Sequence, residues 1–159
     1  GVDATTQIAS HLERIPVFNK PGDSGFPANS PQDVEARARA YLEVNCEHCH
    51  SPGGFAASTG LYLDSFRPID SSFGICKQPT AAGQEGSGLR TYDIQPGAAH
   101  KSILEFRISP EATTPGARMP PLARSVVHDE GHELIEQWID EVVTADEARY
   151  PGSTSCAGR

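Results

Sequence analysis

The residues best suited to chemistry lie in one short run, Cys46-Glu47-His48-Cys49-His50, which forms a C-x-x-C-H pattern. Two cysteines at this spacing can each form a thioether with a vinyl group on one edge of a protoporphyrin. The histidine that follows can then direct its imidazole at the iron. The pattern predicts one covalently bound haem c, with Cys46 and Cys49 as the anchors and His50 as the proximal iron ligand.

Two other uses of a C-x-x-C pair compete with haem attachment. A thioredoxin-like dithiol is expected within a βαβ unit, and the surrounding sequence does not have that pattern. A structural zinc site requires four ligands, but Cys76 and Cys156 stand alone in the sequence rather than as a second pair. Haem attachment is therefore the leading hypothesis.

The chain contains one methionine, Met119, and it stands in a proline-rich stretch, residues 115–122. It follows His50 in the chain, and the prolines after it restrict the backbone, so the loop can hold a thioether against iron. We expect Met119 to be the distal iron ligand. A methionine packed in the core is one alternative. His100 is the alternative ligand, and it would give a bis-histidine iron.

Composition and charge exclude several classes of protein. The chain has 159 residues, a length typical of one domain, and its hydrophobic content of 37% is low for a globular protein. A buried porphyrin would supply part of the missing apolar core. The net charge of -8 argues against nucleic acid or an anionic membrane surface as a partner. No apolar run reaches the length of a membrane span.

The remaining cysteines bear on the compartment. Bacterial haem c is attached after export, so we expect a periplasmic or secreted protein whose secretory signal preceded Gly1. With Cys46 and Cys49 bound to haem, Cys76 and Cys156 either form the one intramolecular disulfide still available or stay as free thiols. An oxidising compartment favours the disulfide.

The chain divides into three parts by composition. Residues 1–29 are expected to form an N-terminal arm or linker, because prolines and glycines interrupt any regular element there. Residues 30–150 are expected to form the haem domain, and residues 151–159 a C-terminal tail tied back by the disulfide. The stretch 51–97 is rich in Gly, Ser and Pro and should wrap the haem as a loop.

Three helices are expected around this loop. Ser30 can cap a helix over residues 31–44, which leads directly into the C-x-x-C-H motif. A second helix is predicted over residues 98–107. A third is predicted over residues 128–143, where apolar residues recur at helical spacing.

The loop itself is expected to contain two short strands, at residues 61–63 and 73–75. Its apolar side chains argue for burial rather than disorder. The side chains expected to be buried are Phe55, Leu61, Leu63, Phe66, Phe73 and Ile75.

The last predicted helix has one apolar and one acidic face. We expect Trp138 to pack across the first helix near Tyr41, with Gly131 allowing close contact. The acidic face is interpreted as solvated, with docking of a basic partner as the alternative. His128 and His132 stand four residues apart, but a zinc-protease helix is rejected because a glutamate, Glu136, stands where its second histidine is required.

The order of these parts resembles a class I c-type cytochrome: a helix, the C-x-x-C-H motif, loops and short helices, a methionine loop and a C-terminal helix. The resemblance covers about residues 31–143. Short stretches are similar to a subgroup of exported bacterial haem modules, some of them attached to secreted polysaccharide-degrading proteins. These stretches are Ala38-Arg39-Ala40-Tyr41-Leu42, Asn45-Cys46, Pro52-Gly53-Gly54, Gly74-Ile75-Cys76-Lys77, Met119-Pro120-Pro121-Leu122 and Trp138-Ile139.

This resemblance implies a mainly α protein with the cytochrome c fold, in which several short helices surround one haem beside a long loop-rich insertion with minor β structure. It implies a single-electron carrier rather than an enzyme, working between a redox donor and a redox acceptor as a monomeric module of a larger secreted protein. A copper-containing lytic polysaccharide monooxygenase is the acceptor that it points to. The alternatives are a peroxidase-like enzyme or gas sensor with an open iron site, and a docking module whose haem is structural.

One departure from the family concerns the proximal histidine. A Gly-Pro-Leu sequence often follows the haem motif in such proteins and supplies a carbonyl partner for the imidazole. In this chain Ser58, Thr59, Gly60 and Leu61 occupy the corresponding region. The partner of His50 is therefore left open by the sequence.

Overall fold

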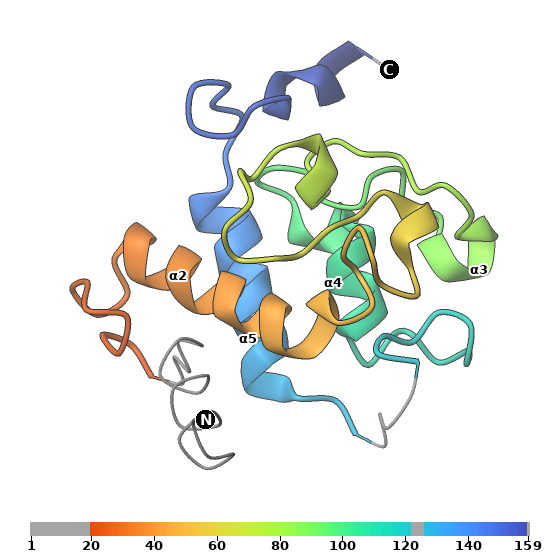
Figure 1. The fold of residues 1–159 in the computed structure, drawn as a ribbon, viewed down its shortest axis with the longest axis horizontal. Coiled ribbons are helices and arrows are strands. Elements are labelled where there is room, and N and C mark those ends of the chain that lie inside the picture. Colours follow the sequence, from red (N-terminus) through yellow and green to blue (C-terminus); the bar gives the residue numbers. More distant parts are fainter. Residues whose placement is uncertain (1–19, 122–125, 159) are drawn as a thin grey trace, which may run out of the picture.

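The computed structural model describes residues 20–121 and 126–158, and in these residues the protein is mainly helical (Figure 1). The only β pairing among them consists of two isolated bridges, Ile75 with Ile94 and Tyr92 with Ser102. The mainly α prediction is confirmed. No described helix is both long and apolar enough to cross a membrane.

The first described helix, α2 (Pro31–Leu42), begins where the sequence predicted. The Ser30 side chain accepts a hydrogen bond from the backbone N–H of Asp33, and Pro31 occupies the first helical turn. The helix continues as a π-helical turn, Glu43–Glu47, that carries the chain into the cysteine motif. The continuous helical run from Pro31 to Glu47 thus sets the direction in which the chain enters the motif.

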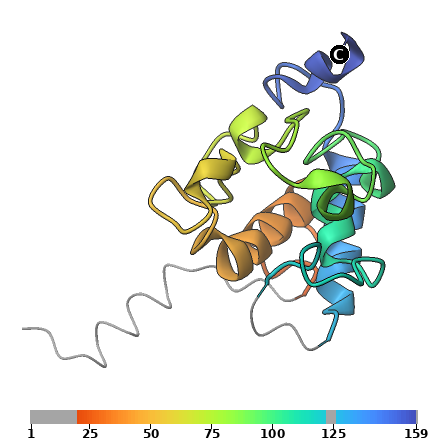
Figure 2. The same cartoon turned by 90° about the vertical axis from the view of Figure 1, so that its right-hand side faces the viewer.

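The last helix, α5 (Asp129–Gln137), continues as a π-helical turn over Trp138–Val142 and packs against α2 (Figure 2). A Cβ atom on Gly131 would overlap the Tyr41 ring, so glycine permits this close approach as expected. The turn that carries Trp138 contacts α2, as expected. The aromatic partner of Trp138 is Phe73, which it meets edge-on at 6.1 Å between ring centroids, whereas Tyr41 stacks on His128.

The predicted helix over residues 98–107 is divided in two. A short 3-10 helix, Ala99–Lys101, precedes α4 (Ile103–Ile108). Ser102 between them is extended, because its hydroxyl donates to the Ala98 carbonyl at 3.0 Å and accepts from the Gln95 N–H at 2.9 Å. These contacts turn the chain and set the direction of α4.

The stretch 51–97 contains short helical turns instead of the predicted strands. These are the 3-10 turns Ala57–Thr59 and Ser71–Phe73 and the helix α3 (Gly83–Ser87). Residues 61–63 lie outside any bridge, and Ile75 is the only residue of 73–75 that pairs. The loop is held by separate hydrogen bonds rather than by a sheet.

Burial within this loop differs from the expectation. Leu63, Phe73 and Ile75 are buried in the core with α2 and α5. Phe55 and Phe66 are instead 97% and 86% exposed, so the prediction that they are buried is wrong. Apolar composition identified a folded loop but not which aromatic rings point outward.

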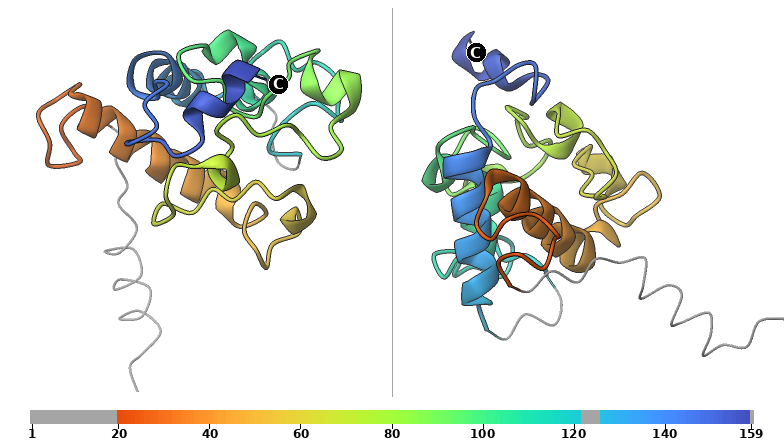
Figure 3. Two further views of the ribbon diagram at one scale, coloured as in Figure 1. Left: turned by 90° about the horizontal axis from the view of Figure 1, so that it is seen from above. Right: turned by 90° about the vertical axis from the view of Figure 1, so that its left-hand side faces the viewer.

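The C-terminal tail crosses the top of the molecule and ends beside the loop (Figure 3). Tyr150 is buried, and its hydroxyl donates to Glu35 of α2 at 2.8 Å. Beyond it, Cys156 lies in the 3-10 helix Ser153–Gly158 and is joined to Cys76 by a disulfide, with Cα atoms 5.0 Å apart. Residues 1–19 of the predicted arm lie outside the described residues.

Candidate functional site

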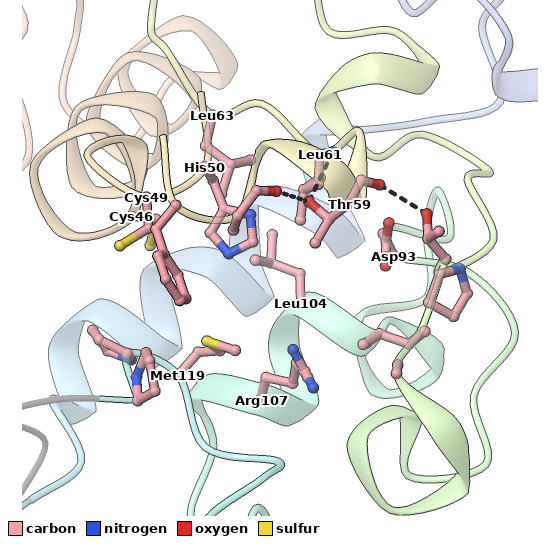
Figure 4. Close-up of a pocket in the computed structure, with 18 of the residues that line it drawn as sticks. Cys46, Cys49, His50, Thr59, Leu61, Leu63, Asp93, Leu104, Arg107 and Met119 are labelled. Atoms are coloured by element: carbon pink, nitrogen blue, oxygen red, sulfur yellow. Dashed lines mark hydrogen bonds between the residues drawn. The ribbon is translucent and has the colours of Figure 1, made fainter. Parts of the chain in front are cut away.

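A cavity of about 350 Å³ lies between the cysteine motif, the loop and α4 (Figure 4). Its size falls within the range of small-molecule and cofactor sites. All four predicted haem contacts line it: Cys46, Cys49, His50 and Met119. Residues 69 positions apart in the sequence, His50 and Met119, therefore meet at one site.

The two motif cysteines are both free and both reach the cavity. The backbone N–H groups of Cys49 and His50 donate to the Cys46 carbonyl at 3.1 and 2.9 Å, which closes the turn and brings both sulfur atoms to one side. Burial, and secondarily the neighbouring Cys49, raise the pKa of Cys46 to about 12. In the unmodified chain this cysteine is a neutral thiol at neutral pH.

His50 stands on one wall of the cavity with its ring pointing inward. Its carbonyl accepts from the Leu63 N–H at 2.9 Å, which fixes the backbone behind the ring. Burial lowers the pKa of His50, and a hydrogen bond to the Leu61 backbone raises it to a smaller extent. The buried Nδ1 atom has no well-formed hydrogen bond to any described residue. The Leu61 backbone therefore lies where the sequence left a partner open, without a full hydrogen bond to the ring.

Thr59 holds the Leu61 backbone in place. The Thr59 hydroxyl accepts from the Leu61 N–H at 3.2 Å and donates to the Ala56 carbonyl at 2.7 Å. Gly60 between them is left-handed, with φ of 63°, which turns the chain towards His50. The hydroxyl of Thr80 donates to the Thr59 carbonyl at 3.0 Å and links this turn to the next part of the wall.

Met119 lies across the cavity from His50 (Figure 4). Its backbone N–H donates to the Arg107 carbonyl at 2.9 Å, so α4 positions the methionine loop. The side chain is half-buried and packs against the core. Met119 thus both contacts the core and lines the cavity, the two positions considered for it from the sequence. The rival ligand His100 is exposed and does not line the cavity.

The opposite end of the cavity from the cysteines is charged. Lys77 and Asp93 form an ion pair at 3.0 Å, and burial raises the pKa of Asp93 whereas Lys77 lowers it. Arg107 extends from α4 into the same region, with its guanidinium donating to the Gly86 carbonyl at 2.9 Å. Burial also lowers the pKa of Arg107.

These charged residues were not among the predicted site residues. Arg107 could have been found, because it follows Ile103 by four positions in a predicted helix and so shares its face, and both residues line the cavity. Lys77 and Asp93 gave no such signal, since their pairing depends on how the loop closes. The cavity therefore has an apolar wall, a thiol edge and a charged end.

This arrangement matches the chemistry of a haem. The cysteines offer two covalent anchors on one edge, a histidine and a methionine face each other, and Leu63, Leu104 and Ile108 add apolar surface. The charged end suits the carboxylates that a porphyrin bears on one edge. The residues present fit the group that the motif predicts.

Comparison of the chain with protein-family models, with curated proteins and with solved structures gave no match. The function must therefore be inferred from the chemistry of this cavity.

Proposed function

We propose that this protein is a single-haem c-type cytochrome that carries one electron at a time between redox partners in the periplasm or outside the cell. The observation that carries the proposal is the meeting of Cys46, Cys49, His50 and Met119 at one cavity. The motif alone accounts for the first three residues. The distant Met119 supplies independent support, because its position depends on the fold.

Each part of the cavity would have a separate task. Cys46 and Cys49 would anchor the haem, and His50 and Met119 would hold its iron, which supplies reversible one-electron chemistry when the haem is bound. Leu63 and other apolar side chains keep water from the centre of the cavity. Arg107 places a positive charge at the end where porphyrin carboxylates would lie.

Electron transfer is favoured over catalysis by the positions of the two iron ligands. His50 and Met119 project from opposite walls (Figure 4), so the two side chains together would hold the iron and would leave no free ligand position for oxygen or peroxide. The order of helix, motif, loop, methionine and final helix supports assignment to the class I cytochrome c fold. The chain departs from the family pattern beside His50, where Leu61 lies in place of the usual Gly-Pro-Leu sequence.

The rim of the cavity offers a route to a partner. Phe55 lines the cavity and is almost fully exposed, and Pro121 is also exposed at this rim. Apolar exposed residues at a cavity mouth are typical of a docking surface. Pro120 also lines the cavity.

The attachment of haem is tested by extraction of the protein as purified from a host with the haem-attachment machinery. We expect the haem to remain with the chain in acid acetone and to give the pyridine haemochrome of a two-thioether haem. Replacement of Cys46 and Cys49 by alanine should abolish this attachment. The matched control, Cys76→Ser with Cys156→Ser, should keep it. Haem that extracts freely from the unaltered protein contradicts the proposal.

The distal ligand is tested by Met119→Ala. The ferric protein should show the weak near-infrared band of sulfur-to-iron ligation, and the substitution should remove that band and lower the reduction potential, because a thioether favours ferrous iron. His100→Ala is the control and should change neither. If the near-infrared band persists in Met119→Ala, Met119 is not the distal ligand.

A further inference from the structure

A second group of potential metal ligands lies where α4 meets α5. Among the described residues, Glu105, His132 and Glu136 place one ligand atom each within 4.8 Å of one another. Glu105 belongs to α4, and the other two stand four residues apart on one face of α5. Leu104 and Arg107 of α4 face the haem cavity, whereas Glu105 faces α5. The group is separate from the proposed haem site.

The geometry of the group is close. The Nε2 atom of His132 lies 2.7 Å from Oε1 of Glu105, and its Nδ1 atom lies 3.7 Å from Oε2 of Glu136. The side chains of Glu105, His132 and Glu136 are 6%, 16% and 43% exposed. The site is thus anchored in the core at Glu105 and open to solvent at Glu136.

Glu105 provides the independent observation. Its carboxylate is more than nine-tenths buried, yet the Oε2 atom accepts no hydrogen bond from any described residue. A buried carboxylate oxygen without a donor is costly, so an unaccounted ligand is a physical explanation for it. Burial raises the pKa of Glu105, while His132 and Arg90 lower it.

The nearby charges leave the group short of positive charge. Among the described residues, Arg90 is the arginine that pairs with Glu105 Oε2, at 3.8 Å, but it lies nearer to Glu111, at 3.1 Å. It also stacks over the Phe106 ring, which holds the guanidinium away from the group. Within the part of the chain that the structure describes, two carboxylates and an imidazole therefore share part of one arginine charge.

We propose that Glu105, His132 and Glu136 bind one divalent transition-metal ion, with zinc as the ion that the donor set suits. One imidazole nitrogen and two carboxylate oxygens are ordinary zinc ligands, and a water molecule would complete a tetrahedron. Ligand atoms in such a tetrahedron lie about 3.4 Å apart. To admit the ion, the Glu105–His132 pair would have to open slightly. Glu136, which lies beside the other ring nitrogen, would have to rotate towards the nitrogen that binds the ion.

On binding, the metal ion would take the place of the proton in the hydrogen bond between His132 and Glu105. The site would then release a proton as zinc enters, and its affinity would rise with pH. The ion would also link α4 to α5. Because the folded chain binds zinc more tightly than the unfolded chain, saturation should raise the melting temperature.

The test is calorimetric titration of the full-length, haem-loaded protein with zinc chloride, together with metal analysis after equilibrium dialysis. Both motif thiols are occupied in that form. If the purified chain carries no haem, Cys46 and Cys49 are alkylated before the titration, so the outcome does not depend on the proposed function. We expect one zinc ion per chain, a binding heat that varies with the ionisation enthalpy of the buffer, and a higher melting temperature.

Two substitutions at the site have matched controls on the same helix. His132→Gln and Glu136→Gln should each weaken zinc binding at least about tenfold, since the loss of outer-shell partners alone has such an effect. His128→Gln and Glu133→Gln change neighbouring exposed residues outside the group and should leave the affinity unchanged. Glu136 is partly exposed, so its variant is expected to fold even if the His132 variant does not.

The proposal is overturned by any of three results. The first is that the unaltered protein does not bind zinc, and the second is that the affinity is unchanged by both site substitutions. The third is that the two control substitutions reduce the affinity as much as the site substitutions do. Circular dichroism of each variant verifies that a loss of binding does not come from unfolding.

Discussion

The helical frame and the loop wall of this protein are held together by different forces. The frame consists of α2 and α5, whose apolar faces pack together through residues such as Leu42, Ile135 and Trp138. The loop wall, residues 51–97, depends on the Lys77–Asp93 ion pair, the Thr59 hydroxyl and one disulfide. The loop wall lines the cavity, whereas α2 is connected to it only through the π-helical turn and the motif that follow the helix. The two regions should respond differently to mutation, redox conditions and pH.

This difference has a physical cause. Apolar packing between helices buries surface continuously and depends little on any single polar partner. The loop buries a smaller fraction of its side chains than the two helices do, and its backbone groups are satisfied by separate hydrogen bonds. Arg39 of α2 illustrates this: its guanidinium donates to the carbonyls of Ser65 and Arg67 and lies over Phe73. The loop wall is therefore fastened to the frame at separate points.

The largest effect is expected from breaking the frame. Trp138 is fully buried, so Trp138→Ala should lower the free energy of unfolding by about 3–5 kcal/mol. Denaturant unfolding followed by circular dichroism measures the change. Trp138→Phe keeps most of the volume and should cost less. A loss below about 1 kcal/mol would show that the frame does not depend on this packing.

Removal of the disulfide tests the loop wall. Cys76 and Cys156 are 80 positions apart, and opening so long a loop should cost roughly 2–5 kcal/mol in Cys76→Ser with Cys156→Ser. We expect the loss to be concentrated in the wall, with hydrogen exchange faster in residues 51–97 than in α2. The intact mass of the unaltered protein after alkylation without reduction shows whether Cys76 and Cys156 are joined before the substitution is made. Labelling of Cys76 and Cys156 before reduction contradicts the bridge.

The next effect concerns pH and the start of α2. Asp33 is fully buried, and although burial raises its pKa, hydrogen bonds from Ser24, Asn29 and Gly22 and the charge of Arg37 lower it overall. Because the folded-state pKa is below the ordinary value of 3.8, Asp33 stabilises the protein above that pH, and this stability is lost as the pH falls through the folded-state pKa.

Asp33→Asn tests this link. The substitution should lower the free energy of unfolding at pH 7 by about 1–3 kcal/mol. It should also reduce the loss of stability on acidification, measured by urea unfolding between about pH 5 and pH 2. Asp23→Asn changes an exposed carboxylate in the preceding turn and is the control. An unchanged acid dependence in Asp33→Asn would falsify the link.

The smallest effect on stability is expected at the rim. Phe55→Ser should change the free energy of unfolding by less than about 0.5 kcal/mol, because the ring is almost fully exposed. It should nevertheless slow electron transfer to a copper polysaccharide monooxygenase in stopped-flow measurements. Phe66→Ser is the matched control, since Phe66 is equally apolar and exposed but does not line the cavity. Equal rates of electron transfer in Phe55→Ser and Phe66→Ser would show that the rim is not part of the docking surface.

The sequence by itself determined the features that depend on local spacing. The C-x-x-C-H motif brings two thiols and an imidazole to one turn whatever the rest of the chain does. Ser30 with Pro31 sets the start of α2, because capping involves residues within one helical turn. The apolar repeat around Ile135 likewise identified α5 and its buried face.

Only the tertiary structure decided which distant residues meet. The placement of Met119 opposite His50 was a hypothesis from chain order, but the position of Leu61 beside His50 and the Lys77–Asp93 pair at the charged end needed the closed loop. The exposure of Phe55 also depended on the direction of the chain at that point. Periodicity describes one element at a time. Contacts between elements arise when burial, hydrogen bonding and chain closure are satisfied together, and no local pattern contains that information.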